Sequence, residues 1–359
     1  MIHKMKVAQV CPRYLPNIGG IETHVLEISR KLVDRGIEVE VLTTDPSGKL
    51  PEEETINCVK IKRFKSWAPN ESYFFSSDLR KHLIDNSNNF DIVHAHSYGA
   101  FPALYTAQAK NTNKLVFTPH YHGTGHTLFR SLLHIPYRFL GKRIFRKADK
   151  IICVSNYEKN LVVNHFNMNE DKVMVIPNGV NLEEFKDLEK KQKTHSTILC
   201  VCRLEKYKGA HHLIHILPNL NDNTVLELIG NGPYKKYLVD LARKLHLEDR
   251  VMFFQDLPRT VLLQKYANAD VFVLLSEHEA FGISVEEALA AKTPCIVANA
   301  SALKEWIDNR TCFGVSFPIK HEELTGAIKN VIGRQLSKVK VWDWEEIVET
   351  LIGLYKEGL

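Results

Sequence analysis

Two glutamates in the C-terminal half of the chain stand at a spacing that suits a phosphorylated ligand carrying a diol. Glu279 and Glu287 are separated by seven residues and follow an apolar run typical of a strand. Between them, Phe281, Gly282 and Ile283 lead into an expected helix, whose first backbone N–H groups lack partners within the helix and can bind an anion. Glu287 falls about one turn inside that helix, where a carboxylate can accept hydrogen bonds from a ribose. Either glutamate alone is more often a solvated or capping charge, so the arrangement carries the prediction.

Two cations and a glycine turn follow other predicted strands. Arg203 and Lys208 come after the run Ile198–Val201, and an arginine fork beside a lysine point charge suits two phosphate groups. Gly230 and Gly232 belong to the turn Gly-Asn-Gly-Pro after the next apolar run, where glycine lets the backbone approach a nucleotide closely. In isolation, such cations are more often surface charge, and such a turn is more often a plain turn.

Five histidines stand at or after predicted strands of the N-terminal half: His94, His96, His120, His122 and His126. A spacing of two residues places His94 with His96, and His120 with His122, on common strand faces. No cysteine or carboxylate accompanies them at ligand spacing. We therefore expect structural or substrate-binding histidines and no metal site, with zinc as the alternative.

The elements that must position these residues form two series of alternating strands and helices. A strand at Lys6–Cys11, a glycine turn, a helix at Ile21–Arg35 and a strand at Glu38–Thr43 make a βαβ unit, which implies a parallel sheet. Further strands are expected at Ile92–Ala95, Leu115–Thr118, Ile151–Val154, Val173–Ile176, Ile198–Val201, Val225–Ile229, Val251–Phe254, Val271–Leu275 and Cys295–Ala298. The fold class is therefore α/β, with two Rossmann-like, doubly wound parallel-sheet domains facing across a cleft.

The length of the chain fits this division. Its 359 residues correspond to about two domains of roughly 150 residues each. We expect an N-terminal domain over 1–180, a C-terminal domain over 181–341 and a terminal amphipathic helix over 342–359. The charged, apolar-poor stretch Asn181–His195 is expected to be a linker.

Composition excludes several classes of protein. With 44% apolar and 25% charged residues the chain is neither disordered nor fibrous. No run of about 18 apolar residues predicts a membrane span, and the first residues lack the apolar stretch of a secretory signal. Seven scattered cysteines without a C-x-x-C pair argue against a disulfide scaffold. We expect a cytoplasmic protein, with the inner face of the membrane as its alternative location.

Charge is distributed unevenly along the chain. Residues 1–180 carry 24 Lys and Arg against 17 Asp and Glu, a net charge of +7, whereas the remainder carries −2. Within the first half, His126–Lys150 has seven cations against one acid, interleaved with bulky apolar residues. This pattern predicts either a segment that contacts an anionic membrane or a core-facing helix with a solvated basic face. Nucleic acid is not expected as a partner, since no recognition motif accompanies the charge.

Taken in order, these motifs resemble a known family. Arg203, Lys208, Gly230-Asn-Gly232-Pro233 and Glu279-x7-Glu287 are similar to the donor half of the retaining family 4 glycosyltransferases of GT-B fold. The N-terminal half agrees through Gly19-Gly20-Ile-Glu22-Thr-His24, Asp91-Ile-Val-His94-Ala-His96, Thr118-Pro-His120, Ala148-Asp149 and Ile176-Pro-Asn178-Gly179. The resemblance covers nearly the whole chain and is specific to the superfamily, not to a substrate.

The resemblance implies roles for the donor-side residues. Arg203 and Lys208 would hold the diphosphate of a UDP- or GDP-linked sugar, and Glu287 would bind the ribose. Glu279 and the backbone of Phe281–Ile283 would contact the donor sugar and its phosphate. The sugar would be transferred with retention, by front-face attack of the acceptor without a covalent enzyme intermediate.

On the acceptor side, the resemblance implies that His120 reaches the transferring sugar and that Gly19 and Gly20 line the cleft. The acceptor would be a glycan, a lipid-linked sugar or a phospholipid. Because the chain has no Asp-x-Asp motif, a metal-dependent transfer is not expected. The alternatives are a nucleotide-sugar epimerase of related fold and a non-catalytic scaffold of GT-B type.

Three departures from the family pattern leave the base and the donor sugar open. Gln255 stands where the family often has glycine beside the base, and Ser301-Ala302 replaces a usual glycine pair. Lys292 also replaces a glycine, and a left-handed backbone there would cost on the order of 1 kcal/mol. None of these changes removes a charged group expected to bind phosphate.

Overall fold

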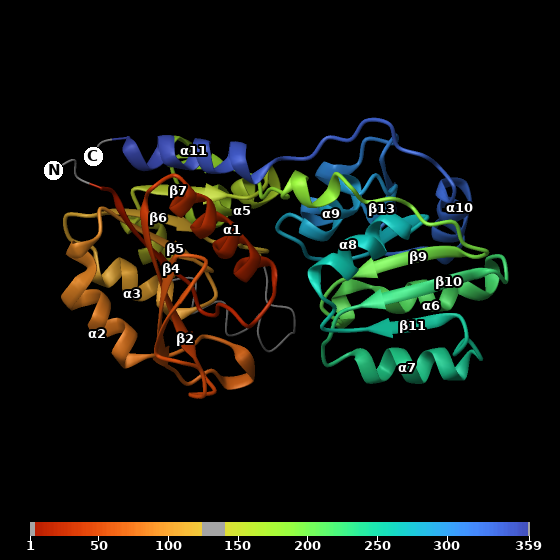
Figure 1. The fold of residues 1–359 in the computed structure, drawn as a ribbon, viewed down its shortest axis with the longest axis horizontal. Helices are drawn as coiled ribbons and strands as arrows, with labels where there is room; N and C mark the ends of the chain where they lie inside the picture. Colours follow the sequence, from red (N-terminus) through yellow and green to blue (C-terminus); the bar gives the residue numbers. More distant parts are fainter. Residues whose placement is uncertain (1–3, 124–140, 358–359) are drawn as a thin grey trace. The chain divides into compact units, whose positions relative to one another are not determined.

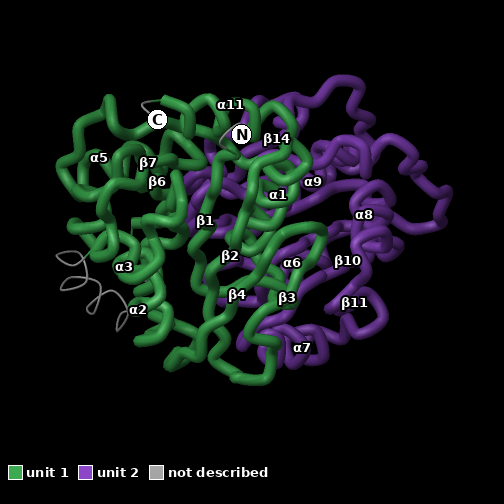
Figure 2. Tube along the Cα trace, turned by 60° about the vertical axis from the view of Figure 1, so that its left-hand side comes forward, with its two compact units in different colours: residues 1–178, 344–359 green, residues 179–343 purple. Residues whose placement is uncertain are grey.

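The computed structural model describes residues 4–123 and 141–357 of the chain (Figure 1). The chain divides into two compact units, coloured separately in Figure 2. Unit 1 comprises Met1–Asn178 and Trp344–Leu359, and unit 2 comprises Gly179–Asp343. The chain thus leaves unit 1 once and returns to it for its last helix.

Unit 1 is built on an eight-stranded sheet of order β3-β4-β2-β1-β5-β6-β7-β8. Every neighbouring pair is parallel except β3 with β4 at one edge. The strands are β1 (Lys6–Val10), β2 (Glu38–Asp45), β3 (Glu53–Ile56), β4 (Val59–Lys65), β5 (Ile92–His96), β6 (Lys114–Thr118), β7 (Lys150–Cys153) and β8 (Val173–Val175). The central strand β5 is buried at every residue, as expected for a parallel sheet covered on both faces.

The helices of unit 1 connect these strands. They are α1 (Gly20–Asp34), α2 (Ser77–Asn86), α3 (Phe101–Ala109), a helix at 141–147, α5 (Asn156–Phe166) and α11 (Trp344–Lys356). Two of them begin at serine caps: Ser76 Oγ accepts a hydrogen bond from Leu79 N at 3.2 Å, and Ser155 Oγ accepts one from Glu158 N at 3.1 Å. Such caps satisfy N–H groups that the helix itself leaves unpaired.

The terminal helix α11 packs against α1 within unit 1. Its apolar face buries Trp344, Ile347, Val348, Leu351 and Tyr355. At the rim, Lys31 of α1 and Arg35, which directly follows α1, form ion pairs with Glu345, and Arg35 also pairs with Glu349. Since rim ion pairs contribute about 1 kcal/mol or less each, the apolar face is the main attachment of α11.

Unit 2 is built on a six-stranded, wholly parallel sheet of order β11-β10-β9-β12-β13-β14. The strands are β9 (Ser196–Val201), β10 (Thr224–Ile229), β11 (Val251–Phe254), β12 (Val271–Leu274), β13 (Cys295–Ala298) and β14 (Cys312–Val315). The helices are α6 (Ala210–Ile216), α7 (Lys235–Lys244), α8 (Arg259–Asn268), α9 (Ile283–Ala290) and α10 (His321–Val331). α6 contacts α7 and α10, while α8 contacts α9, so the connections form two helical layers.

Three strands were not predicted from the sequence. β3 and β4 form a hairpin at the edge of the sheet, and lysines alternate with apolar residues at the start of β4. β14 is a short edge strand that contains Gly314. Edge strands are buried on fewer sides than central ones, so their sequences carry a weaker apolar signal.

The expectation that Asn181–His195 is a linker is wrong. A short 3-10 turn at Leu182–Phe185 seats the Phe185 ring, 8% exposed, in a small apolar cluster with Leu263 and Ala290. Further on, Lys190 and Lys193 both pair with Asp270. This stretch is therefore attached to unit 2 through Phe185 and Asp270, while most of its residues are exposed.

Candidate functional site

Three of the predicted motifs meet at one edge of the unit 2 sheet. β10, β9 and β12 are parallel neighbours, so the residues that follow them share the carboxyl edge, where ligands of such sheets bind. Arg203 follows β9, Gly230 follows β10 and Glu279 follows β12. The topology thus places together residues that lie far apart in the sequence.

The glycine turn after β10 packs directly on the loop after β9. A Cβ atom on Gly230 would lie 2.0 Å from Cys202 O, and one on Gly232 would lie 2.4 Å from Leu204 O. Leu204 N donates to Asn231 O at 2.9 Å, which fixes the contact. Glycine is required at both positions because backbone meets backbone there, and this packing joins the turn to the loop that carries Arg203.

Lys208 and Glu279 form an ion pair at this edge. Lys208 Nζ lies 2.5 Å from Glu279 Oε1, and both side chains are largely buried, at 12% and 16% exposed. Burial lowers the pKa of Lys208, but the Glu279 carboxylate outweighs it, so the pKa lies above its ordinary value. Arg203 is about half exposed and lies 3.4 Å from Glu205, which leaves its guanidinium accessible to an anion.

Gly282 and the start of α9 follow the same loop. Gly282 has φ +101°, and α9 begins at the next residue, Ile283. Phe281 O accepts a hydrogen bond from Trp306 Nε1 at 2.8 Å, and Glu279 N donates to Ser301 Oγ at 3.0 Å. The Ser301 hydroxyl therefore holds the backbone of the loop that carries Glu279.

Glu287 lies inside α9 and is 7% exposed. One carboxylate oxygen pairs with Arg259 Nη1, and the other accepts from Tyr266 OH at 2.8 Å. Burial lowers the pKa of Arg259, but Glu287 and Glu184 together raise it above its ordinary value. A carboxylate offers about four lone-pair positions, so Glu287 can still accept hydrogen bonds from a ligand. Sequence reasoning missed Arg259 and Tyr266, because both lie in α8 without a motif of their own.

In unit 1, three predicted landmarks likewise share a carboxyl edge. β1, β5 and β6 are parallel neighbours; Gly19 and Gly20 follow β1, His96 ends β5 and His120 follows β6. Gly19 is extended, and a Cβ atom there would lie 2.6 Å from Glu22 Oε2. α1 begins at Gly20 and carries His24 to the same edge.

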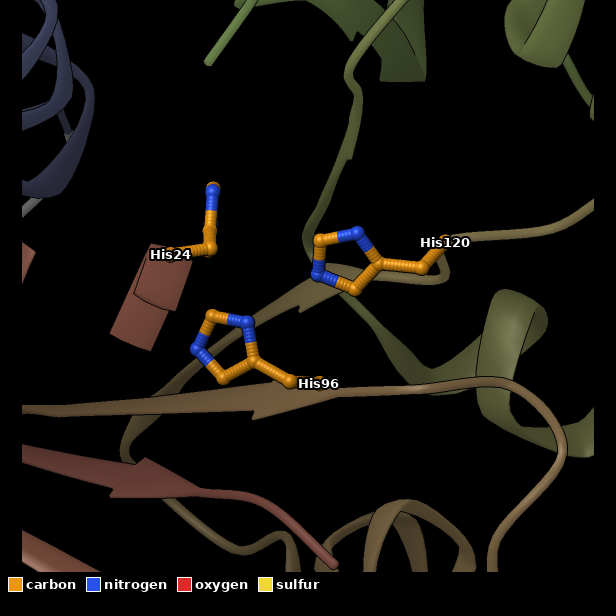
Figure 3. Close-up of side chains that lie close together, drawn as sticks. All are labelled: His24, His96 and His120. Atoms are coloured by element: carbon orange, nitrogen blue, oxygen red, sulfur yellow. The ribbon is translucent and has the colours of Figure 1, made fainter. Parts of the chain in front are cut away.

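His24, His96 and His120 form a compact cluster (Figure 3). The ring centroid of His24 lies 5.3 Å from that of His96 and 5.0 Å from that of His120. One ring nitrogen from each histidine lies within 4.8 Å of one from each of the others. Sequence reasoning grouped His96 and His120 with other histidines but left out His24, because α1 gave no sign that its inner face reaches β5 and β6.

Partners of this cluster fix its rings. His24 Nδ1 lies 2.6 Å from Asn178 Oδ1, and His96 Nε2 lies 2.7 Å from Gln9 Oε1. Burial lowers the pKa of His24 to about 4, although the bond to Asn178 opposes the shift. Burial also lowers the pKa of His96 and of His120 well below the ordinary value, and the neighbouring histidines add to the effect. All three rings are therefore neutral near pH 7.

The other predicted histidines behave differently. His94 bonds outside the cluster, with Nδ1 2.6 Å from Tyr355 OH and Nε2 2.8 Å from Thr118 Oγ1. His126 lies outside the described residues. The expectation that His94 shares a face with His96 is confirmed, since their ring centroids are 4.2 Å apart.

A buried carboxylate supports the turn that carries His120. Glu158 accepts hydrogen bonds from Tyr121 N at 2.5 Å and from Val154 N at 2.7 Å. Burial raises the pKa of Glu158 to about 8, although these two N–H groups lower it. His120 itself has φ +48°, an uncommon backbone conformation. The buried Glu158 side chain thus holds this turn in position through two backbone N–H groups.

Most of the predicted basic segment His126–Lys150 lies outside the described residues, which resume at 141. In the part that is described, Ile144 and Phe145 are buried in the core of unit 1, while Arg143 and Arg146 are exposed. Here the apolar residues are core and the cations form a solvated face. A hollow of about 610 Å³ beside this face is lined by Lys110, Asn111, Arg146, Lys147, Ala148, Asp149, Lys150, Asn169, Asp171 and Lys172.

Across the part of the chain that the structure describes, no helix has the length and apolar character needed to cross a membrane.

Comparisons with known proteins agree with this arrangement. The model of Glycosyltransferase Family 4 matches residues 18–184, and that of Glycosyl transferases group 1 matches residues 181–341. An uncharacterised glycosyltransferase of Methanocaldococcus jannaschii is 28% identical over 390 residues, which cover 98% of each chain.

Two solved structures show the same fold. Sucrose-phosphate synthase from Thermosynechococcus elongatus superposes with a TM-score of 0.84 at 20% identity, over 99% of each chain. Anabaena HepE in complex with UDP-glucose superposes with a TM-score of 0.79 at 17% identity, over 98% of this chain and all of that one.

Proposed function

The chain belongs to the family 4 glycosyltransferases of GT-B fold, and from this premise we propose that it transfers a sugar, with retention, from a UDP- or GDP-linked donor to a glycan, lipid-linked or phospholipid acceptor. The observation that carries the proposal is the meeting of Lys208, Glu279 and the Gly230 turn at one carboxyl edge of the unit 2 sheet. Lys208 and Arg203 supply positive charge where a departing diphosphate needs stabilisation.

Donor binding by unit 2 is supported by the layout of its site. The start of α9 at Ile283 offers backbone N–H groups to a phosphate. Glu287, held by Arg259 and Tyr266, is fixed in position before any ligand arrives, so a ribose diol meets a preorganised acceptor. The UDP-glucose bound to Anabaena HepE is the same class of ligand.

His120 is our candidate for contact with the transferring sugar. Its ring is neutral near pH 7, so one ring nitrogen can donate and the other accept a hydrogen bond. Gly19 and Gly20 would line the acceptor side. We assign no metal to the transfer, since Lys208 and Arg203 provide fixed positive charge on the diphosphate.

The donor is identified by a thermal-shift screen across UDP-, GDP- and ADP-sugars, followed by product analysis. A ligand at 100 times its dissociation constant stabilises the folded chain by about 2.7 kcal/mol, so one nucleotide series should stand out. The anomeric configuration of the product, read by NMR, then tests retention. An epimerised nucleotide sugar without transfer would favour the epimerase, and no stabilisation by any donor would favour a scaffold.

For the acceptor, we propose presentation at an anionic membrane, with the basic segment His126–Lys150 as the contact. Each engaged Lys or Arg contributes about 1 kcal/mol near an anionic leaflet and is screened by salt. Co-sedimentation with anionic and neutral liposomes at low salt tests this. Binding that is absent, or unchanged when Arg138, Lys142, Arg143 and Arg146 become glutamine, would instead indicate a soluble acceptor.

A further inference from the structure

Three imidazoles of unit 1 lie close together, and each has one ring nitrogen without a partner. His24 Nε2, His96 Nδ1 and His120 Nε2 are buried and have no hydrogen-bond partner among the described residues. Figure 3 shows Nδ1 of His96 and Nε2 of His120 facing the space between the rings. A buried polar atom without a partner costs about 1–3 kcal/mol. One ligand that binds all three nitrogens would remove this cost at each of them.

The partners of His24 and His96 determine which nitrogen carries the proton. A carbonyl oxygen only accepts hydrogen bonds. Nδ1 of His24 must therefore donate to Asn178 Oδ1 at 2.6 Å, and Nε2 of His96 must donate to Gln9 Oε1 at 2.7 Å. In a neutral imidazole the other nitrogen then holds a lone pair. These are the same nitrogens that lack partners.

The orientation of Gln9 is itself fixed. Its Nε2 donates to Tyr355 OH at 3.4 Å, and that hydroxyl lies 2.6 Å from His94 Nδ1. His94 Nε2 in turn lies 2.8 Å from Thr118 Oγ1. Gln9 Nε2 donates to this hydroxyl, so the carbonyl end of Gln9 faces His96. The lone pair of His96 Nδ1 is thus directed into the cluster by a chain of bonds that ends on α11.

We propose that His24, His96 and His120 bind a divalent transition-metal ion of the Zn²⁺ and Co²⁺ type through three imidazole nitrogens. Neutral imidazoles suit such ions, whereas Mg²⁺ and Ca²⁺ prefer oxygen ligands. A metal-binding histidine typically donates its other N–H to a carbonyl or carboxylate, and Asn178 and Gln9 accept from two of the three. Three protein ligands with a fourth position open is the pattern of zinc sites that also hold a water or a small ligand.

The distances require a modest closing of the rings. Zn–N bonds of about 2.0–2.1 Å place tetrahedral ligand nitrogens about 3.4 Å apart. In the structure, one ring nitrogen of each histidine lies within 4.8 Å of one from each of the others. His24 and His96 are each anchored by one hydrogen bond to an amide side chain, which permits small ring rotations. His120 as a residue is only partly buried, although its Nε2 atom is buried.

Occupancy has a consequence that rests on the proposed function. A bound ion takes the Nε2 lone pair of His120, the candidate sugar contact, and the metal-free chain is the one proposed to transfer sugar. Zn²⁺ at concentrations near its dissociation constant for this site should therefore inhibit sugar transfer, and a chelator should restore the activity.

Binding is tested on the full chain without donor or acceptor. The protein is stripped with EDTA, dialysed and titrated with Co²⁺, whose visible absorption bands are intense in tetrahedral coordination; Zn²⁺ competition then gives its affinity. One Co²⁺ per chain is expected. His24→Gln and His96→Gln should each weaken binding by at least 100-fold, and Asn178→Ala, which removes only the partner of His24, by about 10–100-fold.

A matched control comes from the surface of unit 2, where His212 Nδ1 lies 3.0 Å from His321 Nε2. His212→Ala removes that alternative ligand pair and should leave the Co²⁺ bands and affinity unchanged. Circular dichroism confirms folding of each variant. The absence of tetrahedral bands in the parent chain, or binding by His24→Gln and His96→Gln as tight as the parent's, overturns the site. Sugar transfer is measured separately, in EDTA. The metal-binding result therefore does not decide the proposed function, and the transfer assay does not decide the metal site.

Discussion

Lys208 Nζ lies 2.5 Å from Glu279 Oε1, so the lysine expected to bind phosphate and the glutamate expected to contact the sugar are already partners of each other. An arriving diphosphate must share or take over Lys208. Glu279 would then be released toward the sugar at the same moment. The pair would in this way couple phosphate binding to the position of the Glu279 carboxylate.

The cations give the first prediction. Arg203→Ala or Lys208→Ala should lower turnover by about 10²-fold or more with the fold intact, because each removes positive charge from the leaving diphosphate. Steady-state kinetics with the identified donor measure this. Lys206→Ala, an exposed cation in the same loop, is the control and should stay near the parent. Turnover of either test variant within about twofold of the parent would refute the assignment.

The two glutamates should separate kinetically. Glu287→Ala should chiefly raise KM for the donor, since it removes the ribose acceptor and leaves Arg259 and Tyr266 without their partner. Glu279→Ala should chiefly lower kcat, because Lys208 loses its partner and the sugar loses a contact. If both variants change KM and kcat equally and slightly, these roles are wrong.

Transfer should persist in excess EDTA. Fixed cations at the diphosphate replace the ion that metal-dependent enzymes use there, and removal of an ion from the histidine cluster should restore activity, not abolish it. Initial rates with and without EDTA, after overnight dialysis against it, provide the measurement. Complete loss that added metal reverses would contradict both statements.

Much of the unit 2 site could be read from the sequence because its residues follow central strands. β9, β10 and β12 are apolar runs that any parallel sheet buries, and motif residues come directly after each. Arg259 and Tyr266 could not be found in this way. Both residues lie in α8 and contact Glu287. The sequence of a helix does not indicate which distant carboxylate its side chains will contact.

In unit 1 the histidine cluster could not be predicted in full for the same reason, because helix sequences do not indicate their distant contacts. His96 and His120 follow strands and were noticed, whereas His24 lies on a helix and Asn178 at the end of the unit. Backbone conformation was partly predictable, since Lys292 has φ +59°, the left-handed geometry that glycine would occupy at lower cost.

Glu158→Gln should weaken the turn that carries His120. The carboxylate accepts from two backbone N–H groups, Tyr121 N and Val154 N, whereas an amide presents one oxygen and turns an NH₂ group toward the other donor. An unsatisfied buried donor costs about 1–3 kcal/mol. Urea denaturation at pH 9 measures this cost, because Glu158 is ionised only above its raised pKa of about 8. Glu170→Gln, on an exposed side chain, is the control. Equal stability of Glu158→Gln and the parent would show that the carboxylate does not hold this turn.

Stability should fall in acid partly through His24. Burial lowers its pKa in the folded chain from 6.5 to about 4, so between these values the unfolded chain binds more protons and the free energy of unfolding decreases as pH falls. The shift corresponds to about 3 kcal/mol when complete. Because Glu158, with a raised pKa, acts in the opposite direction, the measurement compares urea denaturation of the parent and His24→Gln at pH 7 and 4.5, in EDTA. The parent should lose more stability than the variant, whereas His195→Gln, an exposed histidine, should follow the parent; equal losses in parent and His24→Gln would contradict a neutral, buried His24.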